Sequence, residues 1–305
     1  MEISFQKIEL KDKELISAYL DQKVYRSCDL VFPNIYLWSR KYPTKYAVVE
    51  NTLIFQGIAE NGAPSVTFPA GEPEDVRRAL EAVIQWFQKQ QASFRMHLVQ
   101  PKEFELLESW FPGKYQIDYN RDIADYVYET EKLASLAGKK LHGKRNHVNR
   151  FLEHNPEWVY EAISPENVED CFQMALKWRE EMQCEIDVEK RDEMCVTLNA
   201  LRLMEELGLK GGLLRTRPQG EVIAFTVGEP LGKDMFVVHI EKAFAQIQGA
   251  YPMINQQFVL HEAQNYKYVN REEDTGAEGL RKAKLSYRPV FLIEKGVVTL
   301  KDCSQ

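Results

Sequence analysis

No stretch of eighteen consecutive apolar residues occurs in the 305-residue sequence, so we expect no transmembrane helix. The first twenty residues are interrupted by charge every few positions, and we therefore expect no signal peptide. None of the five cysteines forms a C-x-x-C pair, and no Walker loop, zinc cluster or serine or cysteine triad is recognisable. The sequence predicts a cytoplasmic protein with reduced thiols and no bound metal ion.

The sequence also has no excess of positive charge. The net charge of −7 argues against a protein that coats nucleic acid with its whole surface, although it leaves room for one local basic site. What is present is an ordinary globular composition, with 44% apolar and 28% charged residues. The length suits two domains of about 150 residues each.

Hydrophobic spacing predicts alternating helices and strands in the first half of the chain. Residues 73–91 form the strongest helical pattern, because Val76, Leu80 and Phe87 recur at helical spacing. Ahead of this helix, two alternating β-branched stretches on either side of residues 50–51 predict a hairpin.

The second half begins with helices and continues with a three-strand meander over residues 210–244. A loop into a helix, a strand, a short helix and a last strand follow, which is the element order of the acetyltransferase-like (GNAT) fold. The first half is a looser copy of this order. We therefore predict an α/β (α+β) fold of two tandem GNAT-like (acyl-CoA N-acyltransferase-like) domains, each a mixed sheet with helices on both faces.

The predicted domain limits follow a change in composition. Residues 132–150 carry six Lys or Arg residues and no carboxylate. We predict an N-terminal domain over residues 1–131, a basic linker helix over residues 132–155, and a C-terminal domain over residues 156–305.

The stretch "TGAEGLRKAKLSY" is the first candidate site. Thr275 and Glu278 have the spacing of a capping box, which predicts a short helix. Leu280 and Tyr287 are expected to pack inward, while cations such as Lys284 surround the rest. Two interpretations stay open: a solvated surface helix with cations toward its C-terminus, or a site that handles an anion.

The second candidate site lies around "HIEKAFAQIQGAYPMIN". His239 and Glu241 are two residues apart on a predicted strand and so face the same way, which makes either a candidate general base. Downstream, a glycine loop leads into a helix N-terminus, where free backbone N–H groups can hold a phosphate or carboxylate. The predicted donor-binding residues there are Gln246, Gly249, Ala250, Tyr251 and Asn255. A simple capped loop is the alternative.

The basic stretch offers a third candidate, a polyanion site. Lys140, Lys144, Arg145 and Arg150 are placed to bind phosphates, each with a salt-dependent gain. A charged, solvated helix is the alternative. Metal binding is not expected, because the histidines of this stretch are five residues apart and do not stack on a helix.

Four stretches together resemble a known family. They read "NRDIADYVYETEKLASLAGKKLHGKRNHVNRF", "VIAFTVGE", "VVHIEKAFAQIQGAYPMINQQF" and "YVNREEDTGAEGLRKAKLSYRP". The chain is similar over nearly its whole length to proteins related to the C-terminal domain of bacterial phosphatidylglycerol lysyltransferase (DUF2156-type). The resemblance implies two tandem GNAT-like domains and kinship with Fem-type peptidyltransferases, which move an amino acid from aminoacyl-tRNA onto an amine or hydroxyl.

The resemblance also implies residue roles. Lys284-Leu-Ser-Tyr287 is similar to the Lys-x-x-Phe/Tyr element of these transferases, which places Lys284 as a fixed cation near the reacting ester carbonyl. Asn270, Asp274 and Tyr287 belong to the same predicted site. Gln246-x-x-Gly249 matches only part of the coenzyme A loop, because Tyr251 takes the last position of that pattern. This departure weakens the case for an acyl-CoA donor.

These features predict a transferase that moves an aminoacyl group from aminoacyl-tRNA, or an acyl group from acyl-CoA, and requires no cofactor. Its acceptor is expected to be a soluble amine, peptide or small molecule, and tRNA is an expected partner. A second hypothesis is a GNAT-fold module that binds a small molecule, peptide or tRNA without chemistry. The sequence does not determine the oligomeric state.

Overall fold

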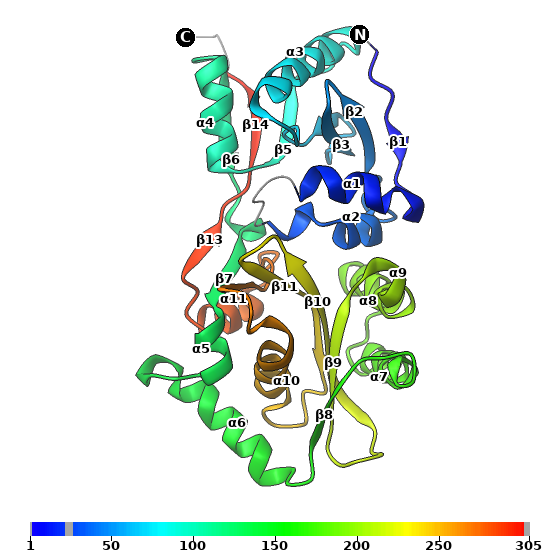
Figure 1. Cartoon of the computed structure of the whole chain (residues 1–305), viewed down its shortest axis with the longest axis vertical. Helices are drawn as coiled ribbons and strands as arrows, with labels where there is room; N and C mark the ends of the chain where they lie inside the picture. The colour runs from blue at the N-terminus through cyan, green and yellow to red at the C-terminus, as the bar shows by residue number, and fades with distance from the viewer. Residues whose placement is uncertain (1, 22–26, 302–305) are drawn as a thin grey trace. The chain divides into compact units, whose positions relative to one another are not determined.

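The computed structural model describes residues 2–21 and 27–301. The chain folds as two compact units, which we call unit 1 (residues 1–124 and 293–305) and unit 2 (residues 125–292). The strands form two seven-stranded sheets, one for each unit (Figure 1). Among the described residues, no helix is both long and apolar enough to cross a membrane.

The sheet of unit 1 has the strand order β1-β2-β3-β4-β5-β14-β6. Its neighbouring strands are antiparallel except for β4 and β5, which run parallel. The strands are β1 (Gln6–Lys7), β2 (Lys45–Val49), β3 (Thr52–Ile58), β4 (Pro64–Val66), β5 (Arg95–Val99), β6 (Tyr115–Tyr119) and β14 (Gly296–Leu300). The helices are η1 (Leu10–Asp12), α1 (Lys13–Leu20), η2 (Cys28–Leu30), α2 (Phe32–Trp38), α3 (Pro73–Lys89), α4 (Pro101–Trp110) and η3 (Arg121–Ile123).

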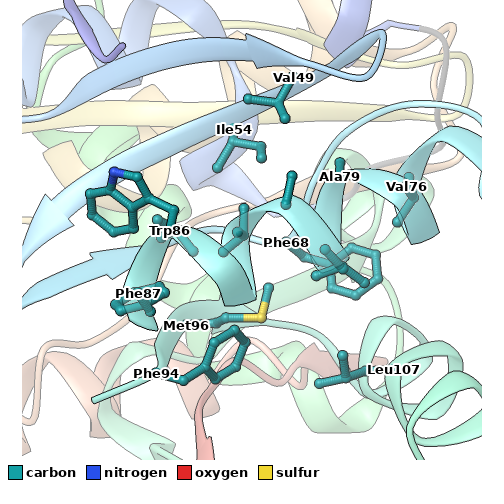
Figure 2. Close-up of a cluster of buried hydrophobic side chains, with 14 of the residues drawn as sticks. Val49, Ile54, Phe68, Val76, Ala79, Trp86, Phe87, Phe94, Met96 and Leu107 are labelled. Carbon is teal, nitrogen blue, oxygen red and sulfur yellow. The ribbon is translucent and has the colours of Figure 1, made fainter. Parts of the chain in front are cut away.

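The core of unit 1 forms around α3, as the helical spacing predicted. The apolar face of this helix, with Val76, Trp86 and Phe87, packs against strand residues such as Ile54 and Met96 (Figure 2). Pro73 occupies the first turn of α3, where its missing N–H costs no hydrogen bond. The predicted hairpin is confirmed as well: β2 and β3 pair across a two-residue turn in which both residues have positive φ.

The sheet of unit 2 has the strand order β13-β7-β12-β11-β10-β9-β8. Its strands are β7 (Asp125–Glu129), β8 (Val159–Ala162), β9 (Lys210–Arg215), β10 (Val222–Leu231), β11 (Met235–Ala243), β12 (Tyr268–Asn270) and β13 (Phe291–Ile293). Its helices are α5 (Thr130–Ser135), η4 (Lys139–Leu141), α6 (His142–His154), α7 (Val168–Glu181), α8 (Val188–Arg202), α9 (Met204–Leu207), α10 (Ala250–Phe258), η5 (Val259–Ala263) and α11 (Glu278–Leu285).

Strands β9, β10 and β11 form the predicted antiparallel meander at the centre of unit 2. Helix α10 covers one face of this sheet, and α7 covers the other (Figure 1). Strand β12 runs parallel to β11 but pairs only with its first three residues, ending at Val237 opposite Asn270. Beyond that point, no described strand pairs with the second half of β11 on the β12 side. This unpaired half carries His239 and Glu241.

The limits of the two units differ from the predicted domains. Strand β7, predicted to lie in the N-terminal domain, pairs with β12 of unit 2. The last predicted strand is split: β13 joins the sheet of unit 2, whereas β14 lies between β5 and β6 of unit 1. The basic helix expected as a linker is α6, which lies within unit 2 and packs on α10. Strand pairing is a long-range property, so the local pattern of a short strand does not reveal its sheet.

The described cysteines are reduced thiols. Cys28, Cys171 and Cys184 are buried and Cys195 is exposed, while Cys303 lies outside the described residues.

Candidate functional site

The segment that follows β12 is held by buried polar side chains. The Asn270 amide donates to Asp125 Oδ2 over 2.9 Å, and its Oδ1 accepts from the backbone N–H of Glu272 over 2.7 Å. Glu272 adopts a left-handed conformation with φ of 57°. Asn270 thereby fixes the turn that redirects the chain immediately after the strand, and so the direction in which Arg271 leaves it.

Asp274 is the second anchor of this segment. Its carboxylate, 0% exposed, accepts two hydrogen bonds from the Arg281 guanidinium, at 2.8 and 2.7 Å, and one from the Gly276 N–H at 2.9 Å. The Tyr126 hydroxyl also donates to it. Burial by itself raises the pKa of Asp274, but these hydrogen bonds outweigh burial and hold the pKa below its usual range. Asp274 is thus a structural anion that orders the loop before α11.

Asp274 replaces the capping box predicted at Thr275 and Glu278. Helix α11 begins at Glu278 with Ala277 as N-cap and without a side-chain cap. Thr275 lies outside the helix at φ 49°. The predicted inward face is also only partly correct, because Leu280 is 43% exposed whereas Tyr287 is 6% exposed. The prediction failed because the N-cap is Ala277, two residues after Thr275, so the Thr275 hydroxyl is not in the capping position.

Lys284 of α11 points back at the same loop. Its ammonium donates to the backbone carbonyl of Arg271 and, over 3.2 Å, to that of Glu272. On the other side, the Tyr128 hydroxyl donates to the Lys284 carbonyl over 2.8 Å. In this structure the Lys284 cation therefore ties α11 to the segment that carries Arg271.

Glu241 forms the centre of a polar triad. Its Oε1 accepts from Arg271 Nη2 over 2.9 Å, and its Oε2 accepts from the Asn255 amide over 3.0 Å. The Arg271 and Glu241 side chains are only 12% and 14% exposed, and Asn255 is 1% exposed. Strand β11, helix α10 and the turn after β12 each supply one member, so the triad depends on the tertiary fold of unit 2.

Two buried atoms of this triad have no hydrogen-bond partner among the described residues. They are Asn255 Oδ1, an acceptor, and Arg271 Nη1, a donor. An unsatisfied buried polar atom costs about 1–3 kcal/mol, so such atoms call for a physical explanation. The pair offers one acceptor and one donor, on two side chains that share the Glu241 carboxylate.

Aromatic rings and a lysine surround Arg271. The Arg271 guanidinium lies 4.7 Å from the Tyr287 ring centroid and 5.8 Å from that of Tyr128. Lys144 Nζ, from α6, lies 4.0 Å from the Tyr287 ring centroid. Burial is the main reason that the pKa of Tyr287 rises to about 12, so its phenol stays protonated at neutral pH.

His239 differs from the predicted base. Its Nε2 lies 2.9 Å from Glu229 Oε1 and its Nδ1 lies 2.7 Å from Glu272 Oε1. Burial by itself lowers the pKa of His239, but the two hydrogen-bonded carboxylates outweigh burial and raise the pKa to about 10. At neutral pH the imidazolium therefore has a proton on each nitrogen and no lone pair with which to accept another.

Helix α6 approaches the predicted donor loop closely at Gly249. Gly249 is the N-cap of α10 with φ of 84°, and a Cβ built on it would lie 2.2 Å from the His147 carbonyl oxygen. Ala250 is buried and Tyr251 is half-buried, while Gln246 is exposed and donates to Glu181 over 3.3 Å. Since α6 approaches this position so closely, only glycine fits at the N-cap of α10.

The four predicted polyanion residues have different surroundings. Arg145 donates to the backbone carbonyls of Leu136 and Gly138, the latter over 2.9 Å. Lys140 and Arg150 are exposed, and Lys144 is half-buried beside Tyr287. Among these residues, only Lys144 lies beside the Arg271 cluster.

Sequence reasoning identified Glu241, Asn255 and Tyr287 but missed Arg271 and Tyr128. One available signal for Arg271 was its position directly after the predicted strand, since residues at the carboxyl ends of strands in α/β sheets often form sites. Tyr128 carried no such signal, because its strand was predicted to lie in the other domain.

Comparison with known proteins identifies the family and the fold. The family model described as "Phosphatidylglycerol lysyltransferase, C-terminal" matches residues 23–298. A crystal structure of a conserved protein of unknown function from Bacteroides thetaiotaomicron superposes with a TM-score of 0.92 and 37% identity, covering 98% of this chain and 100% of that one. A protein from Mycoplasmoides gallisepticum, described as uncharacterized, is 26% identical over 194 residues. That match covers 62% of this chain and 60% of the relative, less than two thirds of the relative's length.

More distant structures share the fold. L-PGS from Bacillus licheniformis has a TM-score of 0.65 at 14% identity, covering 98% of this chain and 94% of that one. The DUF2156 C-terminal domain assigned to a lysylphosphatidylglycerol synthetase of Agrobacterium fabrum has a TM-score of 0.68 at 13% identity, with coverages of 96% and 92%. FemX has a TM-score of 0.54 at 8% identity, with coverages of 99% and 98%.

The fold class predicted from the sequence, α/β with two tandem GNAT-like units built on mixed sheets, is therefore confirmed. The chain belongs to the phosphatidylglycerol lysyltransferase C-terminal family, as the resemblance predicted.

Proposed function

We propose that this protein is an aminoacyltransferase that takes its aminoacyl group from aminoacyl-tRNA and passes it to an amine or hydroxyl of a soluble acceptor. The observation that carries the proposal is the Glu241 triad with its two unpartnered buried atoms. An aminoacyl ester has the complementary groups. Its α-ammonium donates to Asn255 Oδ1, and its carbonyl oxygen accepts from Arg271 Nη1.

The transfer step places specific demands on these residues. The acceptor nitrogen or oxygen forms a bond to the ester carbonyl carbon, and the bond from that carbon to the tRNA ribose oxygen breaks. The acceptor's proton passes to the Glu241 carboxylate and then to the leaving ribose oxygen, so protons balance. Arg271 stabilises the negative charge that develops on the carbonyl oxygen, a contribution that is often the largest in acyl transfer. Lys284 positions Arg271 by donating to its backbone carbonyl.

An acyl-CoA donor receives less support from the structure. The helix N-terminus that would hold its pyrophosphate starts at Gly249, and the His147 carbonyl of α6 lies against that glycine. The exposed basic residues Lys140 and Arg150 are available instead to contact tRNA phosphates.

The test is to incubate the purified protein with a charged total-tRNA pool and, separately, with a panel of acyl-CoA esters, and to follow donor loss. We expect deacylation of one aminoacyl-tRNA. Asn255→Leu, which keeps the number of heavy atoms and the branched shape but removes both polar atoms, should abolish it. Asn149→Leu, at an exposed position on α6, is the matched control and should retain activity.

Other outcomes would contradict the proposal. Consumption of an acyl-CoA while every aminoacyl-tRNA stays intact would make the protein an ordinary acyltransferase. A ligand that raises the melting temperature without being consumed would favour the non-catalytic binding module.

A further inference from the structure

Two cations share one aromatic ring in unit 2. Lys144 Nζ and the Arg271 guanidinium lie 4.0 and 4.7 Å from the centroid of the Tyr287 ring. They come from parts of the chain more than a hundred residues apart. A single ring attracts each cation by about 1–2 kcal/mol at a desolvated position, but the two cations repel each other. The ring alone therefore does not account for their being held together.

The carboxylates nearby do not neutralise both cations. Glu241 pairs with Arg271 over 2.9 Å. Lys144 makes no ion pair or hydrogen bond within the described residues, although it is half-buried. Helix α10, which packs on α6, contains no Asp, Glu, Lys, Arg or His. Within the described part of the chain, the buried Nη1 of Arg271 also has no hydrogen-bond partner. The two cations and Glu241 therefore carry a net charge of about +1, and Arg271 Nη1 remains available as a hydrogen-bond donor.

Other charged groups near Lys144 leave this balance unchanged. On α6 itself, Arg145 is bonded to backbone carbonyls and His147 is exposed. The neighbouring turn η4 contributes Lys139 and Lys140, both exposed. None of these residues supplies an anion.

We propose that Lys144 and Arg271 form a subsite for one oxyanion of the substrate, a phosphate or a carboxylate, bound beside Tyr287. The inference rests on the proposed function in one respect, because the oxyanion is taken to belong to a substrate of the transfer. One N–H group of Arg271 Nη1 donates to an oxyanion oxygen, while the other donates to the ester carbonyl, and the Lys144 ammonium donates to a second oxyanion oxygen. Charge-assisted hydrogen bonds of this kind are roughly twice as strong as neutral ones.

Oxyanion binding is coupled to the proton on Lys144. Burial is the main reason that the pKa of Lys144 falls to about 8, and repulsion from Arg271 lowers it further against the opposing pull of Glu241. A bound oxyanion favours the charged ammonium and raises that pKa. The protein accordingly takes up protons when the anion binds near pH 8, and its affinity decreases as pH rises through this range.

Sulfate is a suitable probe, because its charge is constant from about pH 6 to pH 9. Titration calorimetry in two buffers of different ionisation enthalpy reports both the affinity and the proton uptake. With only protonated Lys144 competent, affinity should fall about tenfold between pH 7 and pH 9. No aminoacyl donor or acceptor is required, so the result is independent of whether transfer occurs.

Substitutions locate the effect. Lys144→Met should remove sulfate binding, whereas Lys144→Arg, which stays charged, should retain binding and abolish its pH dependence. Lys282→Met, an exposed lysine of α11, is the matched control and should behave like the wild type. Unchanged sulfate affinity in Lys144→Met, or a pH dependence that persists in Lys144→Arg, would overturn the subsite.

Two competitors then identify the source of the oxyanion. Adenosine 5′-monophosphate represents the terminal nucleotide of a tRNA donor, and N-acetylglycine represents a peptide-like acceptor. Displacement of sulfate by the nucleotide alone assigns the subsite to a phosphate, and displacement by the carboxylate alone assigns it to the acceptor. If neither displaces sulfate at a hundredfold excess, the subsite does not serve a substrate and the proposal fails, even if transfer is observed.

Discussion

Replacing Lys284 with methionine tests whether its cation holds the loop that carries Arg271. The ammonium donates to two backbone carbonyls, those of Arg271 and Glu272. Hydrogen bonds to a charged group contribute about 1.5–3 kcal/mol each, but Lys284 is half-exposed and water replaces part of what is lost. The expected loss is therefore about 2–3 kcal/mol in the free energy of unfolding of unit 2.

This loss should be visible in thermal unfolding. For a unit of this size, each kcal/mol lowers the melting temperature by about 2–4 °C, which gives roughly 4–12 °C for Lys284→Met. Amide hydrogen exchange should increase in residues 271–276, the segment that the ammonium holds. Lys282→Met, an exposed position on the same helix, should change neither quantity. Circular dichroism melts and exchange mass spectrometry of the three proteins are sufficient.

One result would refute the reasoning. If Lys284→Met abolished transfer while its melting temperature stayed within about 1 °C of the wild type, the two backbone contacts would carry no energy. The ammonium would then act directly on the substrate, as the resemblance to Fem-type enzymes implies.

Two further predictions concern buried charges. In the folded protein the pKa of His239 is raised from 6.5 to about 10, because the side chain lies between Glu229 and Glu272. Protonated His239 therefore stabilises the fold. This stabilisation is complete below pH 6.5 and is lost as the pH rises through about 10. Urea unfolding from pH 6 to 10 should show this decline in the wild type and a smaller one in His239→Gln; equal slopes would contradict the assignment. In unit 1, Lys295, 1% exposed, pairs with Asp29 over 2.5 Å, so Lys295→Met should cost about 2–4 kcal/mol in chemical denaturation. The double variant with Asp29→Leu should recover most of that loss, and no recovery would show that the pair is not the cause.

Much of the fold was predictable because its signals are local. Two features depend only on short stretches of sequence, and both were predicted correctly. They are the apolar face of α3, with Val76, Leu80 and Phe87, and the two-residue turn at Glu50 and Asn51. The sheet to which β7 and β14 each belong was not predictable, because the pattern of a five-residue strand is compatible with either sheet.

The sequence predicted several residues of the candidate site but not the hydrogen bonds between them. Glu241 and Asn255 were named, yet their hydrogen bond joins residues fourteen apart on different elements, which no spacing rule encodes. His239 illustrates the reverse case. A histidine two residues from a glutamate suggested a base, but its partners, Glu229 and Glu272, come from other strands and turns and hold it protonated.

The exchange of strands between the two halves of the chain has a consequence for biosynthesis. β14 fills the place between β5 and β6, and its Val298 is fully buried in the unit 1 core. The ribosome reaches this strand only after it has made all of residues 125–292. Unit 2 can therefore finish folding first. The sheet of unit 1 lacks β14 until translation is nearly complete, so the order of folding is the reverse of the usual N-to-C order. A nascent chain stalled before residue 293 would expose the edges of β5 and β6 and become a natural client for chaperones.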